Sequence, residues 1–270
     1  MNDDRVLLDH PAPGVALVTL NYPERMNSMS LDVMLPLRDA LREVGDDNDV
    51  RAVVLTGAGR GFCSGADQSG ERGRMPHVAG LTQVTVALRA MELLDDVVLG
   101  LRGLHQPVIA AVNGPAIGGG LCLALACDIR VAAEDAFFRA AGINNGLTAS
   151  ELGLSYLLPR AIGSSRAAEM MLTGRDVDAA EAERIGLVSQ VLPREDLVAH
   201  AVEIGTRIAG WSRPGVELTK RTLWSSLDAS SLQAHMQAEG LGQLYVRLLT
   251  GNFEEAVAAR KEGRKPSFDD

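Results

Sequence analysis

Apolar residues fall in short unbroken runs through the first half of the chain and at helical spacing through much of the second half. The runs at residues 15–20, 51–56 and 108–112 predict buried strands. After Ser30, apolar side chains recur every three or four positions, which predicts a helix that ends near Val44. Strands that alternate with helices in this way are typical of an α/β domain.

Shorter segments extend this pattern along the chain. Further strands are predicted at residues 6–8, 129–132 and 136–138, and a long helix is predicted at 81–101. Residues 68–80 are polar without a period and predict a mobile loop near a binding site.

The composition becomes helical from Ser164 onward, with helical stretches mostly ended by glycine and no strand expected between them. We therefore expect residues 1–200 to form the core of the protein. Residues 201–270 are expected to form a helical region that covers the core or contacts another subunit.

The stretch from Pro107 to Cys127 carries no charge and contains three consecutive glycines, Gly118 to Gly120. A strand at 108–112, a break at 113–115 and an apolar helix from Leu121 place these glycines at a helix start. Backbone N–H groups there lack intrahelical partners, and glycine allows a negatively charged oxygen to approach them. The segment thus predicts half of an oxyanion hole, although alone it is equally compatible with a tight turn without chemistry. Proline and glycine in its interior argue against a membrane helix.

A second glycine-rich loop, residues 57–67, also follows a buried strand. Two free N–H groups, those of Ala66 and Gly119, would then lie at the same end of the sheet and hold a carbonyl oxygen as it becomes an enolate. One such donor is worth roughly 2.7–4 kcal/mol in reactions of this type.

Three other interpretations of the glycine loops fit less well. A dinucleotide-binding loop would have glycine where Cys63 stands and would need a Tyr-x-x-x-Lys pair, which the chain lacks. A nucleophile elbow at residues 61–65 needs a histidine and a carboxylate in a recognisable context. A phosphate-binding P-loop needs a Gly-Lys-Ser/Thr ending that GPAIGGGL does not have.

Composition narrows the possible partners. A net charge of −9 argues against a nucleic-acid surface, and 46% hydrophobic residues are enough for a substantial core. The three cysteines have no metal-ligand spacing, and the first residues do not resemble a signal peptide, so we expect a cytoplasmic protein without a metal. A basic cluster near the end could bind a phosphate or simply be solvated; it comprises Arg260, Lys261, Arg264 and Lys265.

Several ordered motifs resemble the signature of the crotonase (enoyl-CoA hydratase/isomerase) superfamily. They are FCSGAD at 62–67, AVNGPAIGGG at 111–120 and LACDIR at 125–130, with PERMNS at 23–28 similar to the family's CoA-contact loop and later landmarks at 158–163, 172–175 and 182–188. The resemblance implies a spiral of ββα units with a C-terminal helical trimerisation region. It also implies a homotrimer or a dimer of trimers.

The resemblance further implies an acyl-CoA thioester as ligand, with CoA as part of the substrate and no separate cofactor. The N–H groups of Ala66 and Gly119 would form the oxyanion hole. The residues expected to bind CoA are Arg25, Met26, Ala66, Asp67, Gln68 and Gly118, and the basic C-terminal cluster would reach the phosphates, commonly from a neighbouring subunit.

The chain departs from the hydratase pattern at the two positions where hydratases have glutamate. Cys122 occupies one position and Gly142 the other. Hydration needs one group to activate water and another to deliver a proton, so ordinary two-glutamate hydration is not expected. Cys122 is expected to be a small core residue with a raised pKa.

Glu151 is the remaining candidate base, because a related acidic position is used by the dienoyl-CoA isomerase branch. A dry pocket would raise its pKa. The alternative is a glutamate in the first turn of the next helix, stabilised by the helix dipole. Asp67 and Asp128 are expected to be structural hydrogen-bond acceptors rather than acids.

Two hypotheses of function follow. The first is an enzyme of the enoyl-CoA hydratase/isomerase type that stabilises a thioester enolate, with Glu151 as base for isomerisation, or for hydration or hydrolysis of an unusual acyl-CoA. The second is a protein that binds or carries acyl-CoA without converting it.

Overall fold

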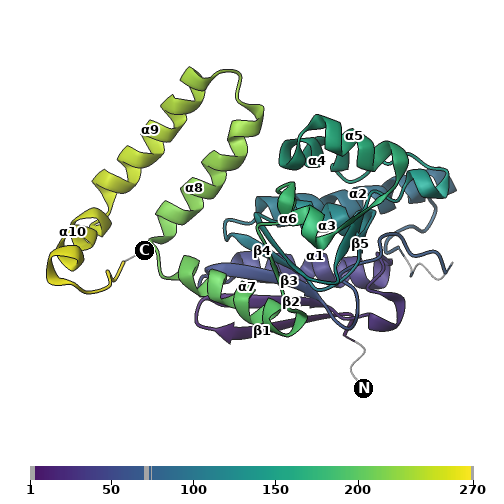
Figure 1. Cartoon of the computed structure of the whole chain (residues 1–270), viewed down its shortest axis with the longest axis horizontal. Coiled ribbons are helices and arrows are strands. Elements are labelled where there is room, and N and C mark those ends of the chain that lie inside the picture. Colours follow the sequence, from purple (N-terminus) through teal and green to yellow (C-terminus); the bar gives the residue numbers. More distant parts are fainter. Residues whose placement is uncertain (1–3, 70–72, 74, 269–270) are drawn as a thin grey trace.

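A six-stranded sheet forms the centre of the computed structural model, which describes residues 4–69, 73 and 75–268 (Figure 1). Part of the predicted mobile loop, residues 70–72 and 74, lies outside the described residues. The strands follow the order β1 (Val6–Ala12), β2 (Val15–Leu20), β3 (Ala52–Gly57), β4 (Val108–Val112), β6 (Ile129–Ala133) and β9 (Gln190–Leu192). β1 is antiparallel to β2, and every other neighbouring pair is parallel.

Helices cover both faces of this sheet, so β3 and β4 are buried along their whole length. Alternate residues of β3 pack on opposite sides because strand side chains alternate: Val53 joins the larger core and Val54 the smaller one. The larger core contains α1 (Leu31–Asp46), α2 (Gln83–Gly103) and α3 (Gly119–Ala126). α7 (Arg194–Ala209) covers the other face of the sheet through Leu197 and Ala201.

The chain also forms a second, three-stranded sheet. It is formed by β5 (Ala116–Ile117), β7 (Phe137–Arg139) and β8 (Asp176–Asp178). The remaining helices of this region are α4 (Leu154–Ile162), α5 (Ser164–Thr173) and α6 (Ala179–Arg184), with short 3-10 turns at η1 (Pro23–Arg25) and η2 (Ile143–Asn145).

Most elements agree with the pattern of the sequence, and the disagreements have local causes. The expectation of no strand after Ser164 is wrong, because β8 and β9 lie there; each has three residues, too few to show a strand period. β1 continues through Pro11 to Ala12, which an edge strand allows. α2 begins two residues later than the predicted helix at 81–101 and ends two residues later, at Gly103.

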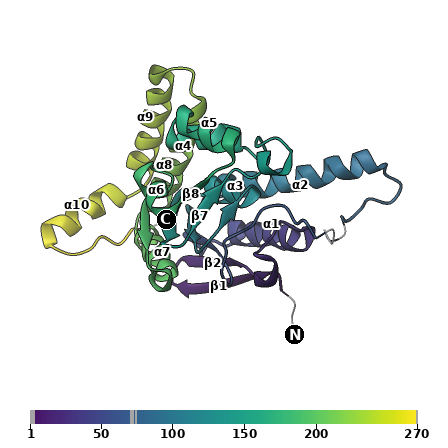
Figure 2. The ribbon, with the colours of Figure 1, turned by 45° about the vertical axis from the view of Figure 1, so that its right-hand side comes forward.

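The last three helices project away from the sheet and are here called the C-terminal arm (residues 213–262; Figures 1 and 2). They are α8 (Arg213–Ser225), α9 (Leu232–Leu249) and α10 (Asn252–Glu262), with η3 (Ser226–Asp228) between the first two. α9 has no buried residue, and its exposed apolar side chains are Leu232, Met236, Leu241, Leu244, Tyr245, Leu248 and Leu249.

A buried ion pair joins the C-terminal arm to the core. Lys220 Nζ lies 2.8 Å from Asp128 Oδ2 and donates to the Gln106 carbonyl at 2.9 Å. Asp128 also accepts hydrogen bonds from Val108 N and Trp224 Nε1. A buried pair is tolerated when its remaining groups are satisfied in this way. Asp128 therefore acts as a structural acceptor, as the sequence predicts.

No helix within the described ranges is long and apolar enough to span a bilayer.

Candidate active site

The two glycine loops lie side by side at the carboxyl ends of β3 and β4. Cys63 and Ala116 form a one-residue parallel bridge, and Ile117 N donates to the Cys63 carbonyl at 3.0 Å. Cys63 N in turn donates to the Pro115 carbonyl at 3.1 Å. A Cβ added to Gly65 would lie 3.3 Å from Gly119 N. The loop at residues 57–67, here called the Ala66 loop, therefore runs directly past the first residue of α3.

Glycine is required where the loops touch. A Cβ at Gly120 would lie 2.0 Å from the Cys63 carbonyl oxygen, which no packing adjustment of a side chain could relieve. Gly118, the residue that caps α3, has a φ of +54°, a conformation that L side chains rarely adopt. Close packing and chemistry are therefore both compatible with this glycine triplet.

Neither Ala66 N nor Gly119 N donates to a protein acceptor in the part of the chain that the structure describes. Gly119 opens α3, where the helix dipole is positive. Ala66 is exposed, whereas Gly119 is buried. Both amides therefore keep a free hydrogen-bonding capacity within the described residues.

Hydrogen bonds to the buried carboxylate of Asp67 fix the Ala66 loop. Asp67 accepts from Ser28 Oγ at 2.9 Å and Ser69 N at 2.7 Å, and Arg25 Nη1 lies 3.4 Å away. Burial raises the pKa of Asp67, but the hydrogen bonds from Ser69, Ser28 and Arg25 outweigh it and lower the pKa to about 2. Asp67 is thus an ionised structural acceptor, and sequence reasoning missed its partner Ser28.

The segment expected to contact CoA packs against this loop. Met29 N donates to the Gly65 carbonyl at 2.8 Å, and Ser64 N donates to the Met26 carbonyl at 3.0 Å. Of the residues expected to bind CoA, Gln68 and Ala66 are exposed at the loop surface, Arg25 and Met26 lie beside it, and Asp67 and Gly118 are buried. Their contact with CoA stays a prediction.

Glu151 lies against the first of these glycines, Gly118. Its Oε1 would be 3.2 Å from a Cβ placed on Gly118, and burial raises the pKa of the half-buried carboxyl. The residue precedes the cap of α4, Gly153, and the first turn of that helix contains no acidic residue. Glu151 is therefore not a first-turn glutamate of α4.

The two positions at which the sequence departs from the hydratase pattern hold no carboxylate and are tightly packed. The Cys122 thiol donates to the Gly118 carbonyl at 3.3 Å and lies 3.6 Å from the Glu151 carbonyl oxygen; burial raises its pKa, so it is a neutral core residue, as expected. A Cβ on Gly142 would lie 1.9 Å from the Thr148 carbonyl oxygen, so the backbone there admits only glycine.

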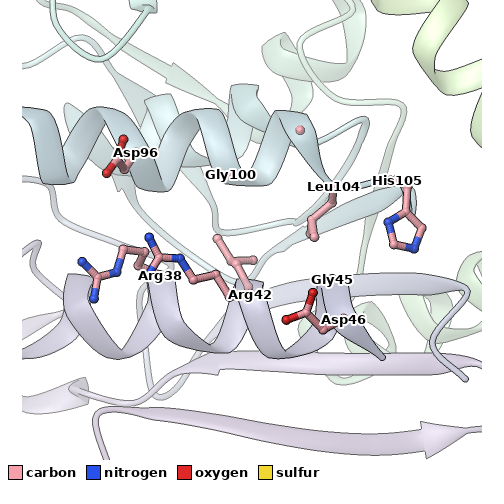
Figure 3. A pocket seen from close by; sticks show the side chains of 10 residues that line it. Arg38, Arg42, Gly45, Asp46, Asp96, Gly100, Leu104 and His105 are labelled. Atoms are coloured by element: carbon pink, nitrogen blue, oxygen red, sulfur yellow. The ribbon is translucent and has the colours of Figure 1, made fainter. Parts of the chain in front are cut away.

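Two other features bear on possible ligands. A hollow of about 540 Å³ lies between α1 and α2, where Arg38, Arg42, Asp46 and Asp96 line it with His105 at one end (Figure 3). It includes no residue of the glycine loops. Among the described residues, no three His, Cys, Asp or Glu side chains gather closely enough to hold a metal ion.

Comparison with known proteins agrees with this arrangement. The family model for enoyl-CoA hydratase/isomerase matches residues 11–270. A probable enoyl-CoA hydratase of Mycobacterium tuberculosis is 73% identical over 265 residues, which cover 98% of this chain and 93% of that protein.

Solved structures show the same likeness. A probable enoyl-CoA hydratase/isomerase from Mycobacterium abscessus is 70% identical with a TM-score of 0.93, over 98% of both chains. A protein from M. smegmatis described as a monofunctional enoyl-CoA isomerase is 64% identical with a TM-score of 0.74, over 87% of this chain and 99% of that one. The chain therefore belongs to the enoyl-CoA hydratase/isomerase family and has the crotonase fold.

Proposed function

We propose that this protein is an enoyl-CoA isomerase that moves a double bond along an acyl-CoA thioester, with Glu151 as its single base. One observation carries the proposal: the Glu151 carboxyl lies over Gly118, next to the unoccupied Gly119 amide, whereas positions 122 and 142 supply no second carboxylate. One proton-shuttling group suffices for isomerisation, since the proton removed from the substrate is returned to it.

The two amides and the carboxyl divide the chemistry between them. Ala66 N–H and Gly119 N–H donate to the thioester oxygen, which makes the C2 protons of a 3-enoyl-CoA more acidic. The Glu151 carboxylate removes a C2 proton, and the resulting enolate oxygen carries its negative charge towards the two donors and the positive end of α3. Protonated Glu151 then delivers the proton to C4, which leaves the double bond between C2 and C3.

The raised pKa of Glu151 suits this role, because a carboxylate with a higher pKa is a stronger base. Hydration would also need a group to activate water, and the thiol of Cys122 is neutral and engaged with the Gly118 carbonyl. The description of the M. smegmatis relative as a monofunctional isomerase supports the same choice.

The test compares wild type with Glu151→Gln on 3-hexenoyl-CoA and crotonyl-CoA. Glu195→Gln, which removes an exposed carboxylate from α7, is the matched control. We expect isomerisation of the 3-enoyl substrate by wild type and the control, and its loss in Glu151→Gln. Hydration of crotonyl-CoA that survives in Glu151→Gln would contradict the proposal, and tight binding without turnover would favour an acyl-CoA carrier.

We also propose that the C-terminal arm packs on further copies of this chain in a trimer or a dimer of trimers. The exposed apolar face of α9 would be buried there, and the basic cluster would reach the CoA phosphates of a neighbour. Arg264 of that cluster is paired with Glu255 and Glu262, so Lys261 and Lys265 are the better candidates for phosphate contact. A cytoplasmic location is in keeping with three buried, unpaired cysteines.

Sedimentation equilibrium tests the assembly. Leu244→Asp with Leu248→Asp in α9 should dissociate the assembly. Leu172→Asp, at an exposed position on α5 of the core, should not. A wild-type protein that sediments as a monomer at micromolar concentration would contradict this part of the proposal.

A further inference from the structure

Leu152, which follows the candidate base, has an unusual backbone conformation. Its φ is +46°, in the left-handed region, although it is a bulky residue that is only 7% exposed. Gly153 follows with a φ of +79°. A non-glycine residue in this region persists only where its surroundings impose the conformation, and such residues cluster at functional sites.

The turn formed by Leu152 and Gly153 fixes the main-chain carbonyl of Glu151. Leu154 N donates to the Glu151 carbonyl oxygen at 2.7 Å, and the Cys122 thiol approaches the same oxygen at 3.6 Å. With its carbonyl fixed on the α4 and α3 side, Glu151 presents its carboxyl to Gly118.

The Leu152 side chain packs at the same helix start as the Glu151 carboxyl. Its Cδ1 would be 3.4 Å from a Cβ on Gly119, while Glu151 Oε1 would be 3.2 Å from a Cβ on Gly118. Met29 Sδ would lie closer still to the Gly119 Cβ, so Met29 and Leu152 together bring apolar groups to the start of α3, where the carboxyl rests on Gly118.

We propose that Leu152 is a positioning residue for Glu151: its left-handed backbone directs the carboxyl to Gly118, and its side chain keeps water away from that carboxyl. The inference rests on the proposed role of Glu151 as base. In this proposal, a neighbouring leucine, and not a charged partner, makes the Glu151 carboxylate a stronger base.

The electrostatic surroundings agree with this assignment. Burial is the one cause of the raised pKa of Glu151. Among the described residues, the titratable groups recorded near Glu151 are the thiol of Cys122, which lies 3.6 Å from the Glu151 carbonyl oxygen, and the thiol of Cys63 next to it. Burial raises the pKa of both thiols, so both are neutral at physiological pH. The N-terminus of α3 acts in the opposite direction by favouring the carboxylate. Removing apolar cover should therefore lower the pKa.

Three variants separate backbone from side chain. Asparagine and glycine both tolerate the left-handed conformation, so Leu152→Asn and Leu152→Gly remove only the apolar side chain. Leu152→Gly is the second choice if Leu152→Asn fails to fold, because glycine adopts this conformation without strain. Leu152→Met keeps an apolar side chain. Leu147→Asn, at an exposed position of the preceding loop, is the control.

Two readouts apply to each variant. The Glu151 carboxyl is titrated by difference infrared spectroscopy against Glu151→Gln, which needs no turnover. The pH profile of kcat and kcat/KM is measured with 3-hexenoyl-CoA.

We expect the pKa of Glu151 to fall towards that of an ordinary glutamate in the asparagine and glycine variants. The acid limb of kcat/KM should move to lower pH with it, and kcat should fall about tenfold or more because the base is weaker and less well placed. KM should change less than about threefold, since the groups that bind the thioester remain. Leu152→Met and Leu147→Asn should resemble wild type.

An unchanged Glu151 titration in both Leu152→Asn and Leu152→Gly would overturn the inference, even if Glu151→Gln is inactive. A fully active Glu151→Gln would instead overturn the proposed function, and the infrared titration would still decide whether Leu152 controls the carboxyl.

Discussion

The two sides of the candidate site are built in different ways. The oxyanion side consists of backbone amides on two loops, joined by the Cys63–Ala116 bridge and fixed by Asp67. The base side consists of one side chain, Glu151, on a turn that depends on the left-handed Leu152. Backbone donors need glycines at fixed positions, whereas a carboxylate can reach the same point from different positions along a loop. Under the proposed function, the first side would be common to the family and the second would decide the reaction.

Glu151→Gln tests the base side and has the largest expected effect. Loss of a general base lowers kcat by roughly 10³-fold, about 4 kcal/mol of transition-state stabilisation. The variant should not lose stability. Because the pKa of Glu151 is raised in the native state, ionisation of this carboxyl lowers the free energy of unfolding of wild type as pH rises through the native pKa.

Thermal unfolding of Glu151→Gln and wild type at pH 4 and pH 7.5 checks the expected effect on stability. The variant should be at least as stable as wild type at the higher pH. A marked loss of stability there would mean that the carboxylate has a structural partner.

Gly120→Ala tests the oxyanion side. Its Cβ would meet the Cys63 carbonyl oxygen, so we expect a loss of about 3 kcal/mol in the free energy of unfolding, measured with urea. Gly240→Ala in α9, where a Cβ meets nothing within 4 Å, is the matched control and should stabilise its helix by up to about 1 kcal/mol. Equal changes in the free energy of unfolding at the two sites would mean that the two glycine loops are not in the close contact described at Gly120 and Cys63.

Asp67→Asn weakens the hydrogen bonds that fix the loop containing Ala66 and adds no side-chain volume. We expect a loss of about 2 kcal/mol at neutral pH, because the native pKa of Asp67 is depressed to about 2. That contribution is present above the unfolded pKa of about 3.9 and is lost as pH falls towards 2. The stability difference between the variant and wild type should therefore shrink below pH 4, and a constant difference would contradict it.

Cys122→Ala has the smallest expected effect. It removes a weak hydrogen bond and a little core volume, so a loss of about 1 kcal/mol in stability is expected, with kcat within about threefold of wild type. A loss of activity similar to that of Glu151→Gln would show that the thiol takes part in the chemistry.

The parts of the molecule that depend on local pattern were predictable from the sequence. The buried strands β3 and β4 and the glycine start of α3 follow from unbroken apolar runs and from Gly118 to Gly120. What could not be predicted depends on contacts between distant residues. β9 is a three-residue strand that pairs with β6. Leu152 has a left-handed backbone that its residue type does not predict, and nothing in the sequence at Gly142 indicates the Thr148 carbonyl that packs against it.

The contact between Gly142 and the Thr148 carbonyl also limits how this chain can change during evolution. A single codon change there would introduce a side chain for which no volume exists, so a descendant with two carboxylates cannot arise by substitution at that position. The segment between η2 and Glu151 would have to be rebuilt by insertion or deletion first. Under the proposed function, the path of the main chain at Gly142 would therefore help to keep the reaction an isomerisation.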